Sequence, residues 1–507
     1  MENDSDDPGA SFRPSPTTNK TCTDLVPFCP PISRVPGEII LLICEEVYDN
    51  GHGRSDLSRL SRTCHHAHEF ILPLLYKEIK ATAGCCRPIP GRYEPSAPCS
   101  CSDERRETGF PRLNHKLLHR TLWSYPRLAS LVQRVDIDPR KKSAAGGAIF
   151  DDAADEASLP GVFLLPCIKS IKIPVRDAWA KFETWAALAA RAQSLGMVPV
   201  GPNQTLIFGF PTITHLHLSN ARQVSGWFPV WALLCGCFNV EVLFIEKLWS
   251  HYWDCHKFRL PKRSILVGRI RLFNLTDLDI VHSQMDWYEL PNLVSSRRLR
   301  SVSLVQFQPH LVALSTHPVS ANREGLISPG PGSIIKFFLP SAGTLENLSV
   351  AWAHKDFVTM HAAHPDKIEL IKSMSAFPAL RLLELSYAQV EKSGEDVLVN
   401  LIKGCKKLEA LKLIGITTMP ERELYRFAFH VSELWFPALR MLKLCTNMND
   451  GQAWEALKML PTDEIVSLLA EGRVKLVLRP YHRKPGDPRF PELGFEGDIE
   501  EMVPPES

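Results

Sequence analysis

A short apolar pattern returns along most of the chain. It reads apolar-x-x-apolar-x-apolar, and its last three positions alternate with the period of a β-strand. The eight clearest copies span 213–218, 240–245, 275–280, 299–304, 345–350, 380–385, 408–413 and 439–444. Two earlier copies span 132–137 and 168–173. The pattern predicts a series of short strands separated by longer helical or irregular stretches.

The copies are unevenly spaced, with intervals from the twenties to the forties, and two of them follow near-duplicate segments at 377–381 and 436–440. One such unit cannot bury its apolar strand face alone, so successive units are expected to stack. The predicted fold class is therefore α+β or α/β, with a curved parallel sheet and helices outside it. An ordinary α/β domain with several buried strands is the alternative.

Side chains alternate between the two faces of a strand, so the residues between the apolar pairs are expected on the open face of the sheet. They are His217, Phe244, Asp279, Ser303, Ser349, Glu384, Lys412 and Lys443. Their charge turns from acidic to basic along the chain, which makes this row a candidate target-binding stripe. A solvated face without a partner would carry the same charges.

The region from Val35 to about Lys80 has helical periodicity instead. Pro36 suits a first helical position, and apolar residues from Ile39 to Val47 recur on one face. A second helix is predicted to begin at Ser55, which is a favourable N-cap residue.

A third helix is predicted from Pro73, and it carries Leu74, Leu75 and Ile79. Three helices in under 50 residues bury little surface. The first helix is also apolar on more than one side, so the module needs a cover, from the rest of the chain or from a partner.

Composition narrows the class of protein. The chain has 507 residues, a formal net charge of +2 and 45% hydrophobic residues, so no basic footprint for nucleic acid is present. The most apolar long window, 227–245, is interrupted by Asn239 and Glu241 and predicts a buried helix followed by a buried strand, not a membrane span. Fourteen cysteines without a secretory signal predict free thiols in the cytosol or nucleus.

The predicted organisation has five parts. They are a disordered N-terminus at 1–30, a helical module at 31–80, a Cys/Pro-rich linker at 81–111, the repeat domain at 112–480 and a flexible acidic tail at 481–507. Within the repeat domain, residues 113–134 are predicted to be helical and broken by Pro126.

Clusters of cysteine and histidine are the only candidates for metal chemistry. The run 64–68 contains one cysteine and three histidines, and the linker holds Cys85, Cys86, Cys99 and Cys101. Neither has the spacing of a zinc site, and no phosphate loop, nucleophile elbow or dinucleotide fingerprint is present. We therefore expect no catalytic residue, no metal and no cofactor. Trp249 and Trp253 are candidate aromatic anchors for a target.

The helical module resembles an F-box. The resemblance rests on an ordered set of positions: Pro36, Glu38, Ile39, Ile43, Asp56, Leu57, Leu60 and Cys64, followed by the segment 72–79. Val35 replaces the usual leucine, and His68 stands where the family usually has an aromatic residue. Residues 113–132 also resemble the segment that follows the F-box in many fungal members.

The strand pattern resembles the leucine-rich repeat, although of the eight clearest copies only the last keeps the expected asparagine, Asn447. Together the two resemblances imply a non-enzymatic adaptor of a Skp-cullin-F-box ubiquitin ligase. The F-box would bind a Skp-type adaptor subunit and, through it, a cullin scaffold, while the repeats bind a protein target. No nucleic acid or membrane partner is implied. The residues implied to dock the Skp-type subunit are Pro36, Ile39, Ile43, Leu57, Leu60, Cys64 and Leu74.

Three other interpretations stay open. The helical module could be the plain start of a larger helical domain. The protein could be an F-box and leucine-rich-repeat scaffold with no ligase role. It could also be an unrecognised hydrolase that uses the cysteine and histidine clusters.

Overall fold

A computed structural model gives the structure of the chain. It describes residues 35–49, 53–62, 65–83, 113–114, 122, 124–139, 159–175, 192, 209–220, 228–246, 272–281, 283–286, 290–305, 308–310, 331–351, 370, 372–387, 396–416, 419–446, 451–479, 481–482 and 495–496. The chain divides into a smaller unit, Met1–Leu75, and a larger unit, Tyr76–Ser507.

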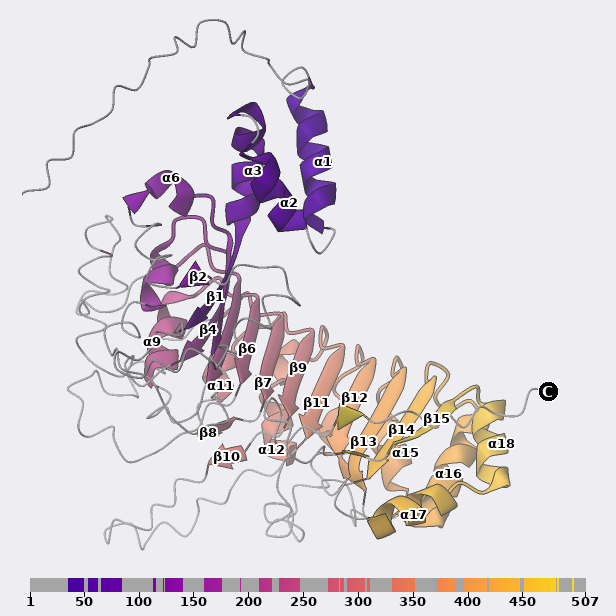
Figure 1. Cartoon of the computed structure of the whole chain (residues 1–507). Helices are drawn as coiled ribbons and strands as arrows, with labels where there is room; N and C mark the ends of the chain where they lie inside the picture. Colours follow the sequence, from indigo (N-terminus) through magenta and orange to yellow (C-terminus); the bar gives the residue numbers. More distant parts are fainter. Residues whose placement is uncertain are drawn as a thin grey trace, which may run out of the picture. The chain divides into compact units, whose positions relative to one another are not determined.

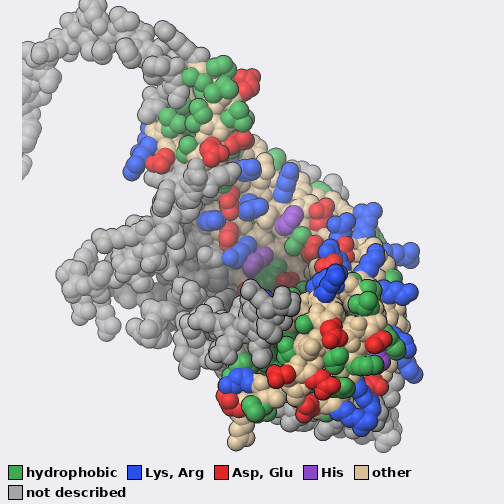
Figure 2. Space-filling view, turned by 90° about the vertical axis from the view of Figure 1, so that its right-hand side faces the viewer, with side chains coloured by type: hydrophobic (Ala, Val, Ile, Leu, Met, Phe, Trp, Pro, Cys, Tyr) green, Lys and Arg blue, Asp and Glu red, His purple; other side chains and the backbone are tan. Residues whose placement is uncertain are grey.

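The smaller unit contains three helices, α1 (Gly37–Asp49), α2 (Gly53–Leu60) and α3 (His65–Lys77), the last of which continues to the unit boundary and just beyond it (Figure 1). Their small core consists of Ile40, Cys44, Leu57, Ala67, Ile71 and Leu74. Hydrophobic side chains also gather on the surface of this unit (Figure 2). The three predicted helices are therefore present, and part of their apolar surface is left outside the core.

Two helix starts differ from the prediction. The second helix begins at Gly53, two residues before Ser55, and the third begins at His65 and contains Pro73 in its interior. A proline is a favourable first residue because its missing N–H is not needed there, and this led to the wrong start.

The larger unit is built on one sheet of 13 parallel strands, consistent with a solenoid-like α/β fold (Figure 1). Its strands are β1 (Glu78–Ala83), β2 (Leu113–Asn114), β3 (Arg134–Pro139), β4 (Ser170–Val175), β5 (His215–Asn220), β6 (Val242–Glu246), β7 (Asp277–Val281), β9 (Ser301–Val305), β11 (Asn347–Ala351), β12 (Leu382–Ser386), β13 (Ala410–Ile416), β14 (Met441–Thr446) and β15 (Lys475–Arg479). They lie side by side in chain order, except that β2 lies outside β1. The predicted parallel sheet is confirmed.

Helices and short turns connect the strands. They are α6 (Pro126–Ala129), η2 (Leu159–Leu164), α9 (Phe228–Gly236), α11 (Leu290–Leu293), α12 (Pro331–Lys336), η7 (Leu339–Ser341), α15 (Val397–Ile402), α16 (Glu421–Ser432), α17 (Gly451–Met459) and α18 (Asp463–Glu471). Two short pairs lie apart from the main sheet: β8 (Gln284–Asp286) is parallel to β10 (Gln308–His310), and β16 (Tyr481–His482) is antiparallel to β17 (Phe495–Glu496).

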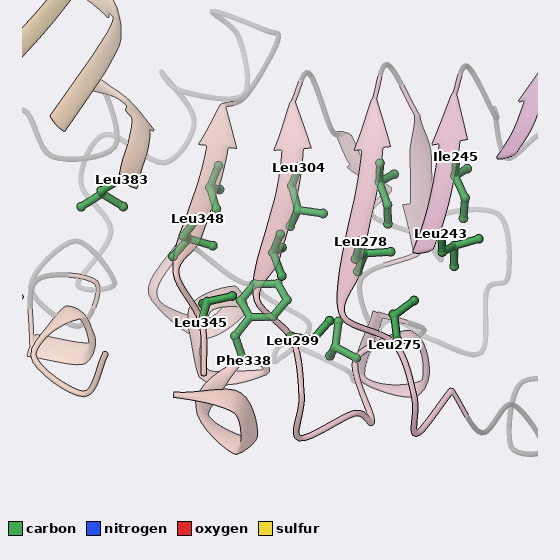
Figure 3. Packing of buried hydrophobic residues seen from close by; sticks show 14 of the residues in the cluster. Leu243, Ile245, Leu275, Leu278, Leu299, Leu304, Phe338, Leu345, Leu348 and Leu383 are labelled. Atoms are coloured by element: carbon green, nitrogen blue, oxygen red, sulfur yellow. The ribbon is translucent and has the colours of Figure 1, made fainter. Parts of the chain in front are cut away.

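The apolar pattern forms one continuous core between the sheet and the helices. Its middle position occupies a single row across neighbouring strands, in which Leu243 pairs with Leu278 and Leu348 with Leu383. The first position, as in Leu299 and Leu345, lies below the same strands (Figure 3). All ten predicted copies are buried in this cluster, because each unit covers the apolar face of the next.

Both ends of the sheet extend beyond the predicted repeats. Ile79, assigned to the third helix from the sequence, lies in β1 and belongs to the core of the larger unit. At the other end β15 adds Leu476 and Leu478 to the core. The division at Leu75 therefore falls five residues before the predicted end of the module at residue 80.

The helix predicted before the first copy is confirmed in part, because Leu122 and Ser124 are helical and a break at Tyr125 precedes a new helix that starts at Pro126. Leu113–Asn114 is strand β2, and Pro126 begins the short helix α6 because proline is tolerated at a first helical position. The apolar window 227–245 is confirmed as a helix, α9, followed by a strand, β6. The predicted N-terminal disorder and the linker lie outside the described residues.

Candidate functional site

Helix α1 presents apolar side chains on two opposite sides. Ile40 and Cys44 face the core of the smaller unit and are buried. On the other side Ile39, Leu42 and Ile43 are 45%, 61% and 52% exposed. These three residues, spaced three and four apart, share one side of the helix. We call them the α1 apolar face.

The neighbours of this face are exposed too. Leu41 is also exposed, and so are Glu38, Glu45 and Glu46 along the same helix. Contiguous exposed apolar residues with a charged surround are typical of a protein interaction site. The chemistry of the face therefore favours a partner with an apolar groove.

The seven residues implied to dock a partner differ in their exposure to solvent. Pro36, Ile39 and Ile43 are exposed, and Leu60 is partly buried. The exposed residues can contact a partner as they stand.

Leu57 and Leu74 are corrected from contact residues to core residues. Both are buried against the inner side of α1, because they face Ile40 and Cys44 across the smaller unit. Cys64 lies outside the described residues. Leu42 was not among the implied docking residues, although its place three residues after Ile39 could have identified it.

The second surface is the face of the main sheet opposite the core, which we call the polar face. The strand register aligns one central residue from each strand except β2 into a continuous row. The row runs Lys80, Asp136, Lys172, His217, Phe244, Asp279, Ser303, Ser349, Glu384, Lys412, Lys443 and Val477. All eight residues predicted to share one face therefore do so.

Opposite charges are paired near both ends of this row. Lys172 Nζ lies 3.5 Å from Asp136 Oδ1 on the neighbouring strand. Lys412 Nζ lies 3.1 Å from Glu384 Oε1. These partly buried pairs have few solvent contacts to compete with them, so they stabilise the alignment of their strands.

The middle of the row, on β5 to β7, has a different composition. The rings of His217 and Phe244 meet edge to face, with centroids 4.2 Å apart. His217 Nε2 lies 3.8 Å from Glu246 Oε2. Asp277 accepts a hydrogen bond of 2.6 Å from the Thr276 hydroxyl group. Charged side chains and histidines also gather around a hollow in the larger unit (Figure 2).

Asp279 has a carboxyl group whose pKa is perturbed by its surroundings. Burial raises the pKa of Asp279. Two effects oppose this increase: a side-chain hydrogen bond with Ser303 and the electrostatic attraction of the nearby His217. The negative charge of Asp277 raises the pKa further. An additional positive charge at this place would therefore stabilise the Asp279 carboxylate.

The predicted target-binding residues are only partly described. The structure aligns His217, Phe244, Asp279, Glu384, Lys412 and Lys443 on the central row. Trp249 and Trp253 lie outside the described residues. Glu246 was not among the predicted residues, because it stands at the end of β6, one residue beyond the copy 240–245. Asp277 lies within the copy 275–280, as part of the acidic portion of this face, but was not among the predicted target-binding residues.

Five of the six described cysteines are buried, and Cys167 is exposed. Burial raises the pKa of the Cys405 thiol to about 12 and raises that of Cys237 as well. Buried thiols of this kind remain protonated and act as small apolar side chains. Within the described ranges, no group of three or more His, Cys, Asp and Glu side chains is arranged to hold a metal ion. The linker cysteines and Cys64 are outside those ranges.

Comparison with models of known protein families gave no match, and a search of curated proteins found no significantly similar sequence. Among the described helices, none combines the length and the apolar character that crossing a membrane requires.

Proposed function

We propose that this protein is an F-box-type adaptor with leucine-rich-repeat-like units, which recruits a protein target to a Skp-cullin ubiquitin ligase. The observation that carries the proposal is the α1 apolar face. The three side chains stay exposed although the smaller unit has its own core. Sequence resemblance to the F-box supplies the identity of the partner, a Skp-type adaptor subunit.

The energetics favour an external cover for this face. Covering the exposed parts of Ile39, Leu42 and Ile43 would contribute about 1 kcal/mol for each side chain. Pro36 starts the helix, and Leu60 lies partly exposed in α2, so both can extend the contact. A surface of this kind is typical of recognition by an apolar groove that receives one face of a helix.

The larger unit supplies the second half of the function. Its core is covered by its own helices, whereas its polar face aligns side chains of both charges in one row. A long row of this kind can bind an extended segment of a target. The adaptor would then act by proximity, because a bound target experiences a raised effective concentration of the ubiquitin-conjugating enzyme. The chain itself needs no catalytic residue.

Co-purification tests the proposal. The full-length chain is expressed with a Skp-type adaptor and a cullin, and the variant Ile39→Asp with Ile43→Asp is compared with the wild type. We expect the double variant to lose the adaptor, with at least a 100-fold weaker affinity, because two carboxylates would be buried without partners. Ile39→Asp with Leu60→Asp should have a similar effect.

The matched control places aspartates on exposed apolar residues of the larger unit, Phe429→Asp with Met459→Asp. This control should retain the Skp-type adaptor. Equal binding by the wild type and the α1 variants would remove the proposal. Recovery of the Skp-type subunit without cullin would favour the alternative, a scaffold without a ligase role.

A further inference from the structure

The edge of the main sheet at which the strands begin carries two exposed phenylalanines on neighbouring turns. The same turn precedes β5, β6 and β7, because the N–H groups of Ile213, Val240 and Leu275 each donate to the carbonyl group three residues earlier. Phe238 and Phe273 stand two residues before Val240 and Leu275, so they occupy the same position in two of these turns. The two side chains are 40% and 59% exposed.

Asparagine side chains join these turns to one another. Asn239 Nδ2 donates a hydrogen bond of 2.9 Å to the Pro211 carbonyl group, and Asn274 Nδ2 donates one of 3.3 Å to Asn239 Oδ1. Pro211 is exposed at the position that Phe238 and Phe273 occupy in the next two turns. The hydrogen bonds therefore link three successive turns, and both rings extend from a backbone that is held in place.

Three arginines follow on the same edge, immediately before β9. Arg297, Arg298 and Arg300 are exposed. In the part of the chain that the structure describes, none of their side chains makes an ion pair or a hydrogen bond. Ser296 Oγ donates a hydrogen bond of 3.1 Å to the Phe273 carbonyl group. The arginine segment therefore lies directly beside the turn that carries Phe273.

Buried hydroxyl groups hold the backbone of the arginine segment. Ser296 and Ser341 are 0% and 1% exposed. Ser341 Oγ donates to the Ser296 carbonyl group at 2.7 Å and accepts from the Leu299 N–H at 3.3 Å. Thr344 Oγ1 donates to the Leu299 carbonyl group at 2.8 Å. A backbone fixed in this way lowers the ordering cost of binding, because only the arginine side chains have to be immobilised.

The space beyond the arginine segment is open. The turn of the next unit lies beside it, because Thr344 Oγ1 also donates to the Arg297 carbonyl group, at 3.4 Å. Gly343 in this turn is exposed, and a Cβ atom there would meet nothing within 4 Å. A bound chain therefore has room beside Arg297.

Glutamates limit the length of this positive segment. Glu241, Thr276, Arg300 and Glu346 follow one another at the starts of neighbouring strands, where the N–H of each later residue donates to the carbonyl group of the one before. A nucleic acid needs a series of cations along its phosphates, and Glu241 and Glu346 interrupt any such series. A peptide with a few carboxylates does not need one. The charges therefore favour an acidic peptide segment over a nucleic acid.

We propose that this edge binds an acidic segment of the protein target. The Arg297 and Arg298 guanidinium groups contact its carboxylates, and Phe238 and Phe273 contact an apolar residue beside them. We call these four residues the Phe–Arg edge. The inference rests on the proposed function, because it specifies the chemistry of the target.

The side chains of the Phe–Arg edge suit this partner. A guanidinium group can donate two parallel hydrogen bonds to one carboxylate, and arginine and aromatic residues are enriched at protein interfaces. The strands β6, β7 and β9 are neighbours, so the edge spans about 10 Å, which an extended segment of about four residues crosses. One short segment can therefore reach both the phenylalanines and the arginines.

Fluorescence anisotropy with labelled peptides tests this inference on the full-length chain. The first probe carries two leucines followed by three glutamates in a Gly/Ser framework. The second has glutamines in place of the glutamates, and the third has serines in place of the leucines. We expect the first probe to bind most tightly, because it alone supplies both the carboxylates and the apolar side chains.

Two double variants separate the contributions. Arg297→Gln with Arg298→Gln should weaken binding of the first probe about tenfold or more, because charged hydrogen bonds to the carboxylates are lost. Phe238→Ser with Phe273→Ser should weaken it about fivefold and leave the affinity of the third probe unchanged, because only the leucines lose their contact. All four side chains are exposed, so both variants should fold.

Matched controls make the same changes elsewhere on the larger unit. They are Arg127→Gln with Arg422→Gln, and Phe429→Ser with Met459→Ser, all at exposed residues. Both controls should bind the first probe as the wild type does. Equal affinities for the first and second probes would overturn the inference, and so would an Arg297/Arg298 variant that binds like the wild type. Tighter binding of a labelled single-stranded oligonucleotide than of the first probe would also overturn it.

The Skp-type adaptor is assayed on the same preparations. The variant Ile39→Asp with Ile43→Asp should lose the adaptor and keep its affinity for the first probe. Absence of probe selectivity with adaptor binding intact would contradict the Phe–Arg edge alone. Probe selectivity in a chain that binds no adaptor would contradict the proposed function alone.

Discussion

The α1 apolar face and the core row of the sheet are made of the same residue types in opposite environments. Leu278 in β7 is 1% exposed, whereas Leu42 in α1 is 61% exposed. Every strand of the sheet has a neighbour or a helix that covers its apolar side. Among the described residues of the smaller unit, none covers the second side of α1 in this way. Large apolar side chains such as Leu434 and Trp435 are also exposed in the larger unit, but α1 carries four of them within residues 39–43, and that is where a partner is expected.

The comparison also separates two kinds of recognition. The smaller unit offers aliphatic side chains to a partner, and its affinity should depend little on salt. The larger unit offers charges in a fixed order on its polar face, and its interactions should weaken at high ionic strength. Under the proposed function, the chain would bind a constant partner and a target by different physical means.

Truncation of one leucine in each region should give the largest contrast. Leu278→Ala leaves a cavity in the core and should lower the free energy of unfolding by about 2–5 kcal/mol. Leu42→Ala removes an exposed side chain and should change it by less than about 0.5 kcal/mol. Urea unfolding of both full-length variants measures the difference. Equal losses would show that Leu42 is covered within the chain.

Two glycines of the larger unit differ in how closely their surroundings are packed. A Cβ at Gly404 would lie 2.3 Å from the Cα of Ser375, whereas a Cβ at Gly343 would meet nothing within 4 Å. Gly404→Ala should therefore cost about 1–3 kcal/mol, because backbone must move. Gly343→Ala should be nearly neutral. Thermal unfolding of the two variants checks this, and a neutral Gly404→Ala would mean that the repeats are loosely packed.

Substitution of Asp279 should have a smaller effect on stability, and its dependence on pH tests the environment of the polar face. Its raised pKa means that the folded state favours the protonated acid, so its contribution to stability falls as the pH rises from the ordinary value of 3.8 through the folded-state pKa. Asp279→Asn removes this charge and should stabilise the protein at pH 7 by up to about 1 kcal/mol.

The gain from Asp279→Asn should disappear below pH 3.8, where both side chains are neutral. Unfolding midpoints measured across this pH range provide the test. A variant that is less stable than the wild type at pH 7 would show that the carboxylate is already satisfied by a cation.

The fold could be predicted from the sequence wherever the apolar pattern was complete. The ten copies and the alignment of residues such as Phe244 and Lys412 follow from strand periodicity alone. The end strands could not be found in this way. Ile79 follows a helix without a break, and β15 follows Arg473, whose backbone has a positive φ of 62°.

The surface residues were harder to predict than the fold. A helix that is apolar on two sides does not show which side faces its own core, so Leu42 was omitted. Leu57, in α2, was assigned to the partner through the resemblance to the F-box. Only the packing of Ile40 and Cys44 against α2 and α3 decides between the two sides. The place of the arginine segment beside Phe273 likewise depends on a hydrogen bond between units, which no spacing along the chain reveals.

Hydrogen–deuterium exchange of the full-length chain, with and without a Skp-type adaptor subunit, tests the central claim most directly. The account predicts that the adaptor slows exchange in peptides that cover α1, residues 37–49, and leaves the strands β5 to β14 unchanged. Unchanged exchange in α1 at saturating adaptor, or protection confined to the sheet, would contradict it.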